Sequence, residues 1–219
     1  MSVYHERFKI RRMALIAVFA ALSYVLMLVI HVPVGGFLTL DVKDVFITIC
    51  GLCFGPLAAL SLAVLVPLLE FLTVSETGLY GLVMNVAGSA AFSVVVSLIY
   101  KHKKSFSGAL IGLLSGVCSM TAVMMLLNLV VTPYYFGIAV AEVRDMIPTL
   151  LLPFNLVKGV LNAGCVLLLY KPLSGILQRF GFLPASKHAF RFDRKTLLVM
   201  LLAVVLIVVS LLIVFLVLR

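Results

Sequence analysis

Long apolar runs alternate with short polar connections along the whole chain. Five of these runs are long enough to cross a hydrocarbon core ~30 Å thick, which takes about 20 apolar residues in a helix. They occupy residues 13–32, 81–100, 106–131, 147–170 and 197–218. A further apolar stretch at residues 45–72 is interrupted by Gly55-Pro56, and proline starts a helix more readily than it continues one. The pattern predicts an all-α integral membrane protein.

The placement of charge indicates how often residues 45–72 cross the membrane. Most of the 17 Lys and Arg residues lie in three clusters, at residues 7–12, 101–104 and 171–195. Two short helices over 45–72 put all three clusters on one side, whereas a single kinked span does not. The positive-inside rule therefore predicts seven spans, a multi-pass protein of the cell membrane with a cytoplasmic N-terminus. Six of the eight acidic residues then lie in or beside the opposite loops: Asp41, Asp44, Glu70, Glu76, Glu142 and Asp145.

Three polar residues interrupt the apolar run at 147–170. Asn155, Lys158 and Asn162 are spaced i, i+3, i+7 and share one face of a helix. An amine ~16 Å along this helix is near the middle of the bilayer, where ionisable residues usually mark a substrate pathway. The alternative is that Lys158 snorkels to a surface or satisfies a buried carbonyl. The two amides on the same face favour a ligand site.

Other polar residues are expected on the outer side of the same bundle. The loop at residues 35–44 contains two glycines, a short alternating segment and two carboxylates that flank a lysine. It either folds back over a cavity or is an ordinary solvated turn. Asn85 and Asn128 lie in the outer half of their spans, although Asn85 has an alternative role as a cap or as a partner of a neighbouring group. Amides, one ammonium group and Tyr, Phe or Met side chains suit a neutral or weakly acidic aromatic ligand.

Several function classes are disfavoured by the residues present. The net charge of +9 is explained by the loop clusters and requires no nucleic-acid partner. The chain has no phosphate-binding loop, and Cys50 and Cys53 lack a second pair for a metal set, so we assign no catalytic residue, cofactor or metal. An intramembrane enzyme would need a nucleophile near Lys158, and an ion-coupled carrier would need a carboxylate deep in a span.

Composition also suggests a division of the chain. Residues 1–172 hold the first six spans, residues 173–196 form a basic linker, and residues 197–219 hold a seventh helix. Within residues 197–218 this last helix carries Ser210 as its only polar residue and shows no face that requires a partner, so we expect an accessory anchor. In the first span, Ala17 and Ala21 form a small-xxx-small pair of the kind that lets helices approach closely.

Five stretches within residues 1–172 resemble a known family. They are GFLTLDVKD (36–44), FGP (54–56), TGLYGLVMN (77–85), NLVVTPY (128–134) and PFNLVKG (153–159). These stretches and the helix count are similar to those of the substrate-binding S components of energy-coupling factor (ECF) vitamin transporters, most closely the riboflavin-binding type.

The resemblance implies a fold, a ligand and partners. It implies a six-helix bundle without ATPase activity that binds riboflavin as a transported ligand in an outward-facing cavity. It also implies assembly with a transmembrane coupling subunit and two cytoplasmic ATPases, with Ala17 and Ala21 at the coupling interface. Folate, thiamine or pantothenate remain alternative ligands, and the seventh helix departs from the family pattern. The implied binding residues are Leu38, Thr39, Asp41, Gly78, Asn85, Asn128, Asn155 and Lys158.

Overall fold

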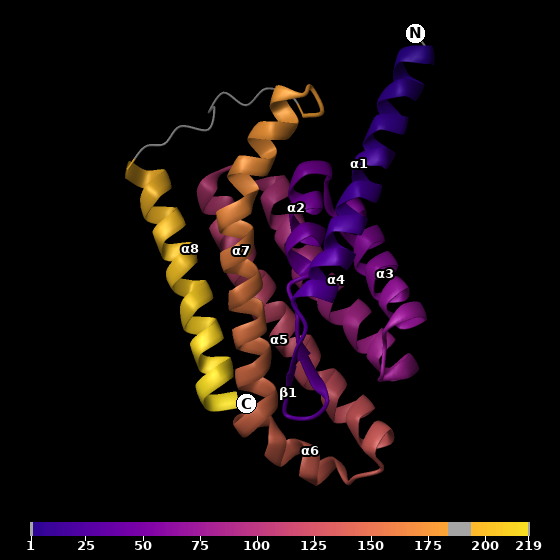
Figure 1. The fold of residues 1–219 in the computed structure, drawn as a ribbon, viewed down its shortest axis with the longest axis vertical. Helices are drawn as coiled ribbons and strands as arrows, with labels where there is room; N and C mark the ends of the chain where they lie inside the picture. The colour runs from indigo at the N-terminus through magenta and orange to yellow at the C-terminus, as the bar shows by residue number, and fades with distance from the viewer. Residues whose placement is uncertain (1, 184–193, 219) are drawn as a thin grey trace.

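The computed structural model describes residues 2–183 and 194–218 as a bundle of helices with one short hairpin packed against one face of its lower half (Figure 1). Six helical segments are long and apolar enough to cross a membrane, and one shorter apolar helix, α2, accompanies them. The seven predicted apolar helices are therefore all present in the described part of the chain. The helices are α1 (Ser2–Val29), α2 (Asp44–Phe54), α3 (Pro56–Thr73), α4 (Gly78–His102), α5 (Phe106–Phe136), α6 (Val140–Met146), α7 (Leu152–Arg179) and α8 (Arg194–Ile213).

The stretch at residues 45–72 forms two helices, as predicted. The break lies at Gly55, whose φ of 97° is a backbone conformation that favours glycine. Pro56 follows at the first position of α3, where its missing N–H costs no helical hydrogen bond. Helix α2 returns the chain to the side on which α1 begins, where Arg12 contacts Phe54. Helix α3 crosses again, so that Thr73 lies beside Tyr24 near the end of α1. Two crossings in this stretch are what the charge pattern requires.

Three of the predicted boundaries are wrong. Helix α1 ends at Val29, before residue 32, because the next residues form strand β1 (Val32–Val34), which pairs with β2 (Leu38–Leu40). Helix α5 continues through Pro133 to Phe136 and ends at Gly137, which adopts a left-handed conformation. Helix α7 likewise continues through Pro172 to Arg179. Proline interrupts a single helical hydrogen bond at each place, and leaving the helix would free more backbone groups from their partners.

Small residues bring the central helices close together. A side chain at Gly112 of α5 would come within 3.1 Å of the Val96 carbonyl oxygen of α4, and one at Gly116 would meet Phe92 and Val96. Such close backbone contact is how helices associate in lipid, which provides no hydrophobic drive between them. Helix α4 thus packs against α5 on one side and against α2 and α3 on the other.

Helix α8 has a specific packing face, contrary to expectation. It lies along α7, on the far side of the bundle from α1 (Figure 1). A side chain at Gly164 of α7 would come within 3.2 Å of the Ala203 carbonyl oxygen of α8. Ala203 and Ser210 are both buried. The packing face of α8 could not be predicted from its regular Leu/Val composition, because two small residues, Ala203 and Ser210, define it rather than a row of polar residues.

Candidate substrate-binding site

The hairpin brings a charged segment into the interior of the bundle. Strand β2 is followed by Asp41, Lys43 and Asp44, which retain only 1%, 1% and 2% of their exposure. The antiparallel register pairs Val32 with Leu40 and Val34 with Leu38, so the chain turns back toward the bundle before α2 begins. Of the two expectations for this loop, the solvated turn is wrong for residues 41–44.

Lys43 is fully paired within the protein. Its Nζ lies 3.1 Å from Asp41 Oδ2, 2.9 Å from Glu70 Oε2 and 3.1 Å from Asn85 Oδ1. Asn85 Nδ2 in turn donates to Glu70 Oε1 over 3.1 Å. An ammonium group has three donors, and Lys43 uses all of them. This lysine therefore fixes the hairpin to α3 and α4 and has no donor left for a ligand.

Lys158 approaches the same carboxylate from α7. Its Nζ lies 2.8 Å from Asp41 Oδ2 and 3.3 Å from the Thr39 carbonyl oxygen. It therefore satisfies a buried carbonyl, as one alternative held, and also forms an ion pair. Burial by itself would raise the pKa of Asp41, but the Lys158 and Lys43 ammonium groups outweigh it and hold that pKa below its ordinary value. The described residues use two of the three Lys158 donors and leave one without a partner.

The two amides on the Lys158 face have different roles. Asn162 Nδ2 donates to the Asp41 carbonyl oxygen over 3.3 Å and to the Lys158 carbonyl oxygen over 2.9 Å, so it helps to anchor the hairpin. Asn155 Nδ2 donates to the Leu151 carbonyl oxygen over 2.8 Å. Asn155 borders a cavity, and Asn162 lies beyond it.

This cavity lies between α2, α4, α5 and α7 and has a volume of about 30 Å³. That volume holds a water molecule, whereas sites for drug-sized ligands measure ~300–1,000 Å³. Two of its polar atoms, Asp44 Oδ1 and Ser89 Oγ, are buried and have no hydrogen-bond partner among the described residues. Buried unpaired polar atoms are costly, so these two atoms are available to pair with a molecule, a water included, that enters the cavity. The lining residues are Asp44, Met84, Asn85, Gly88, Ser89, Met120, Met124, Phe154, Asn155 and Lys158.

The remaining predicted residues lie around this cavity rather than on it. Leu38 is buried in β2, and Thr39 contributes its carbonyl oxygen to Lys158. Gly78 is the first residue of α4, with a φ of 60°. Asn128 donates to the Met124 carbonyl oxygen over 2.7 Å and accepts from the Thr132 hydroxyl over 2.9 Å. Neither Gly78 nor Asn128 lines the cavity as it stands.

Several residues around the cavity were not predicted from the sequence. Lys43 and Glu70 looked like parts of solvated loops or helix ends. Asp44 was expected only as one of the two loop carboxylates, and Ser89 only as a small residue at a helix-packing face. One signal was present: Leu38, Leu40 and Val42 alternate with Thr39, Asp41 and Lys43, which is the pattern of a strand with one apolar face. That pattern predicts that the polar face of the strand is exposed to solvent. In the structure the helices also cover the polar face, so Asp41 and Lys43 are buried together with Leu40 and Val42.

Aromatic side chains connect the tip of the hairpin to the ends of two helices. The Phe37 ring lies 4.9 Å from the Phe136 ring at the end of α5, in an edge-to-face arrangement. Phe136 contacts Tyr135, whose ring lies 5.6 Å from that of Tyr80 at the start of α4. These contacts hold the hairpin tip against the bundle.

Ala17 and Ala21 are both exposed on α1. This face of α1 is free within the described chain, as a contact with another subunit would require.

The family assignment follows from comparison with known proteins. Residues 11–170 match the family model described as "ECF transporter, substrate-specific component". The chain belongs to this family. It is therefore a transporter component and not an enzyme, and helix α8 lies outside the matched residues.

Similar proteins carry consistent names. The S component is 30% identical to the riboflavin transporter RibU of Staphylococcus aureus (strain TCH60) over 77% of this chain and 93% of the relative. It is 27% identical to the riboflavin transporter FmnP of Bacillus subtilis (strain 168), over 69% of this chain and 86% of the relative. A solved structure, titled "Structure and mechanism of the S component of a bacterial ECF transporter", superposes with a TM-score of 0.68 at 30% identity. That comparison covers 78% of this chain and 99% of the solved one.

Proposed function

We propose that this S component captures riboflavin from the outer side of the cell membrane and delivers it together with an ECF module. The observation that carries the proposal is the unused donor of Lys158, which borders a cavity lined by amides, methionines and a phenylalanine. The names of the relatives support riboflavin as the vitamin.

The chemistry of the cavity matches a flavin. The polar edge of an isoalloxazine ring offers carbonyl acceptors to Lys158 and Asn155, and its imide N–H can donate to a carboxylate such as that of Asp44. Met84, Met120, Met124 and Phe154 provide flat apolar contact for the ring system, which suits a chain without tryptophan. The proposed binding residues are Leu38, Thr39, Asp41, Gly78, Asn85, Asn128, Asn155 and Lys158, to which we add Asp44 and Ser89.

Riboflavin entry requires the hairpin to move. The cavity volume of about 30 Å³ is far below the space that such a ligand occupies. The contact between Phe37 and Phe136 is the part of the hairpin attachment that breaks at least cost, because it is apolar and lies at the tip. The Lys43 contacts at the base would persist during this motion. We therefore propose that the hairpin opens at its tip and pivots near residue 43.

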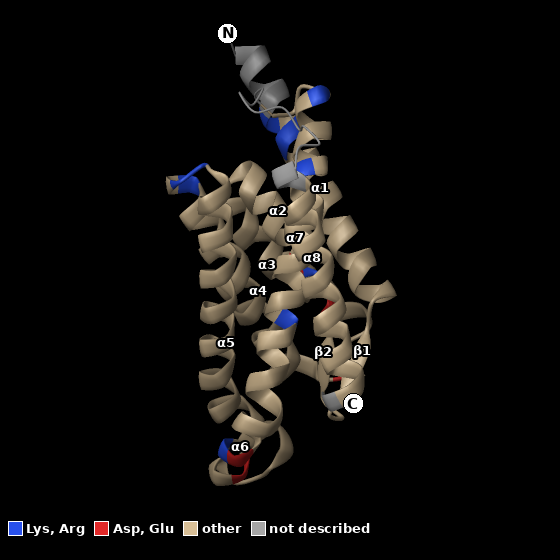
Figure 2. Ribbon diagram, turned by 90° about the vertical axis from the view of Figure 1, so that its left-hand side faces the viewer, with Lys and Arg blue, Asp and Glu red and all other residues tan. Residues whose placement is uncertain are grey.

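The proposed orientation places the N-terminus in the cytoplasm. Basic side chains gather at the end of the bundle from which α1 projects (Figure 2). The hairpin and α6 lie toward the opposite end, which would then face outward. Ala17 and Ala21 would contact the transmembrane coupling subunit, which works with two ATPases. In this proposal residues 1–172 bind the vitamin and α8 is the accessory helix. The linker expected at residues 173–196 is shorter at both ends, because α7 continues to Arg179 and α8 begins at Arg194.

The test is to purify the full chain from cells grown in rich medium and to measure its flavin absorbance. A band near stoichiometric with protein, identified as riboflavin by chromatography, would support the proposal. Ligand-free protein should quench the fluorescence of added riboflavin. Folate, thiamine or pantothenate should not compete. A colourless protein that leaves riboflavin fluorescence unchanged would refute the assignment, and competition by another vitamin would identify the alternative.

A further inference from the structure

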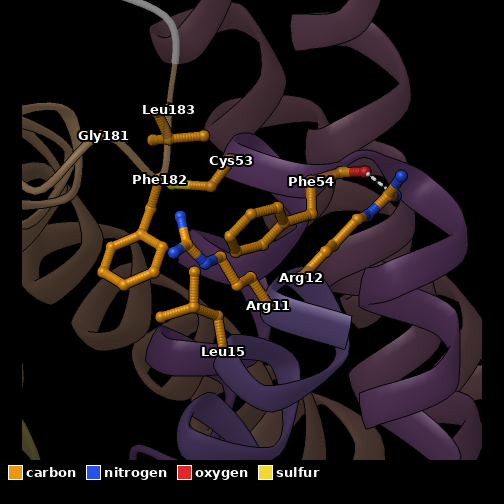
Figure 3. A pocket seen from close by; sticks show the side chains of 8 residues that line it. All are labelled: Arg11, Arg12, Leu15, Cys53, Phe54, Gly181, Phe182 and Leu183. Atoms are coloured by element: carbon orange, nitrogen blue, oxygen red, sulfur yellow. Dashed lines mark hydrogen bonds between the residues drawn. The ribbon is translucent and has the colours of Figure 1, made fainter. Parts of the chain in front are cut away.

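A second cavity lies at the opposite end of the bundle from the hairpin and has a volume of about 190 Å³. It is bordered by the basic start of α1, by the end of α2 and by the residues that follow α7 (Figure 3). Its walls include Arg11, Arg12, Leu15, Phe54 and Phe182, and none of the described residues that line it is acidic. The cavity therefore combines positive charge with apolar walls, and the site at the hairpin does not involve it.

Arg12 has a structural role in this cavity. Its guanidinium donates to the Phe54 carbonyl oxygen over 2.7 Å, and its Cζ lies 6.0 Å from the centre of the Phe54 ring. Phe54 is the last residue of α2, so a cation here compensates free carbonyl groups at the helix C-terminus. Arg12 thereby holds Phe54 in place as one wall.

Arg11 points the other way, into the cavity. Its guanidinium lies between the Phe54 and Phe182 rings and points away from that of Arg12 (Figure 3). Within the described residues no hydrogen bond or ion pair is formed by Arg11, in contrast to Arg12. A guanidinium presents five donors in a planar fork that matches two oxygens of a phosphate group. Arg11 is thus positioned to bind an anion that enters between the two rings.

We infer that this cavity binds the phosphodiester headgroup of an anionic phospholipid. Arg11 would donate to the phosphate, and the glycerol and first acyl carbons would contact Leu15 and Phe182. A free phosphate ion would gain nothing from these apolar walls. A lipid would use both the Arg11 guanidinium and the apolar walls. Farther along α1, Val18 and Val25 are 53% and 54% exposed, so an acyl chain could continue along this helix. Basic pockets between helices at the cytoplasmic membrane surface are known to take anionic lipid headgroups.

Native mass spectrometry of the full chain in detergent tests this inference. The protein is titrated with phosphatidylglycerol, with phosphatidylcholine and, separately, with inorganic phosphate as a competitor. We expect one saturable phosphatidylglycerol site that phosphatidylcholine does not fill. Arg11→Ala should weaken this site by about tenfold to a hundredfold, the value of a charge-assisted hydrogen bond. Lys9→Ala is the matched control, because it removes the same charge from an exposed position on α1 that does not line the cavity.

Arg11→Lys provides a second variant that keeps the charge and the fold. It should bind less tightly than the parent chain because it lacks the planar fork. Equal affinity in Arg11→Ala and the parent, or equal losses in Arg11→Ala and Lys9→Ala, would overturn the inference. Displacement of the lipid by low millimolar phosphate would also overturn it, because the site would then take free anions rather than lipid.

Discussion

Replacing Lys158 by methionine tests the central feature of the site. The change keeps the length and apolar stem of the side chain and removes only the ammonium group, which lies 2.8 Å from Asp41 Oδ2 and 3.3 Å from the Thr39 carbonyl oxygen. Breaking a buried ion pair typically costs ~3–5 kcal/mol, because the other charge loses its partner. Here Asp41 keeps Lys43 at 3.1 Å, so we expect a smaller loss of unfolding free energy, about 1.5–3 kcal/mol.

The expected effect on ligand affinity is separate from this loss of stability. If the remaining Lys158 donor binds a flavin acceptor, its removal costs one charge-assisted hydrogen bond, about 1.5–3 kcal/mol, or roughly tenfold to a hundredfold in Kd. The affinity is measured by titrating riboflavin fluorescence, and the stability by thermal unfolding of the ligand-free protein. Lys103→Met is the matched control, because Lys103 is exposed, follows the last residue of α4 and does not line the cavity.

Two results would refute this reasoning. A Kd within twofold of the parent value would mean that Lys158 does not contact the ligand. A weakened Kd that Asp41→Asn reproduces in full, with no further loss in the double variant, would mean that Lys158 acts only by holding the hairpin.

Three further changes test other parts of the structure. Lys43→Met should lower the unfolding temperature more than Lys158→Met does, because it leaves Glu70 without its cation and frees the base of the hairpin; an equal or smaller decrease would contradict the proposed pivot. Ala17→Leu should leave riboflavin binding unchanged and stop uptake by cells, whereas Ala122→Leu, at an exposed alanine of α5, should affect neither; normal uptake with Ala17→Leu would exclude that coupling face. Gly164→Leu should separate α8 from α7 without changing riboflavin affinity. After cleavage at a protease site inserted between residues 184 and 193, α8 should co-purify with the parent core but not with the variant, and its retention would contradict the close crossing at this glycine.

Much of the architecture was predictable because the bilayer imposes simple rules on a chain. The length of each apolar run identifies a helical span, since a lipid-facing backbone must form its hydrogen bonds within its own helix. The placement of Lys and Arg then shows that residues 45–72 form two helices, because only two crossings put all three basic clusters on one side. Lys158 was predictable for the same reason: a charge in the middle of a span is costly and must have a partner. The helix ends at Phe136 and Arg179 were less predictable, because proline is tolerated where leaving the helix would cost more. The end of α1 at Val29 was less predictable because it depends on the pairing of β1 with β2.

The identity of the partners was decided only by the tertiary structure. Asp41 and Lys158 are far apart in the sequence, and no local pattern pairs them, yet their side chains meet at 2.8 Å. Lys43 looked like a solvated loop residue and is instead buried with all three donors used, because the hairpin folds into the bundle. Sequence alone shows which groups are too costly to leave unpaired in lipid. Only the packing of the helices around the hairpin decides which of them are paired with one another and which, like the last donor of Lys158, have no partner among the described residues.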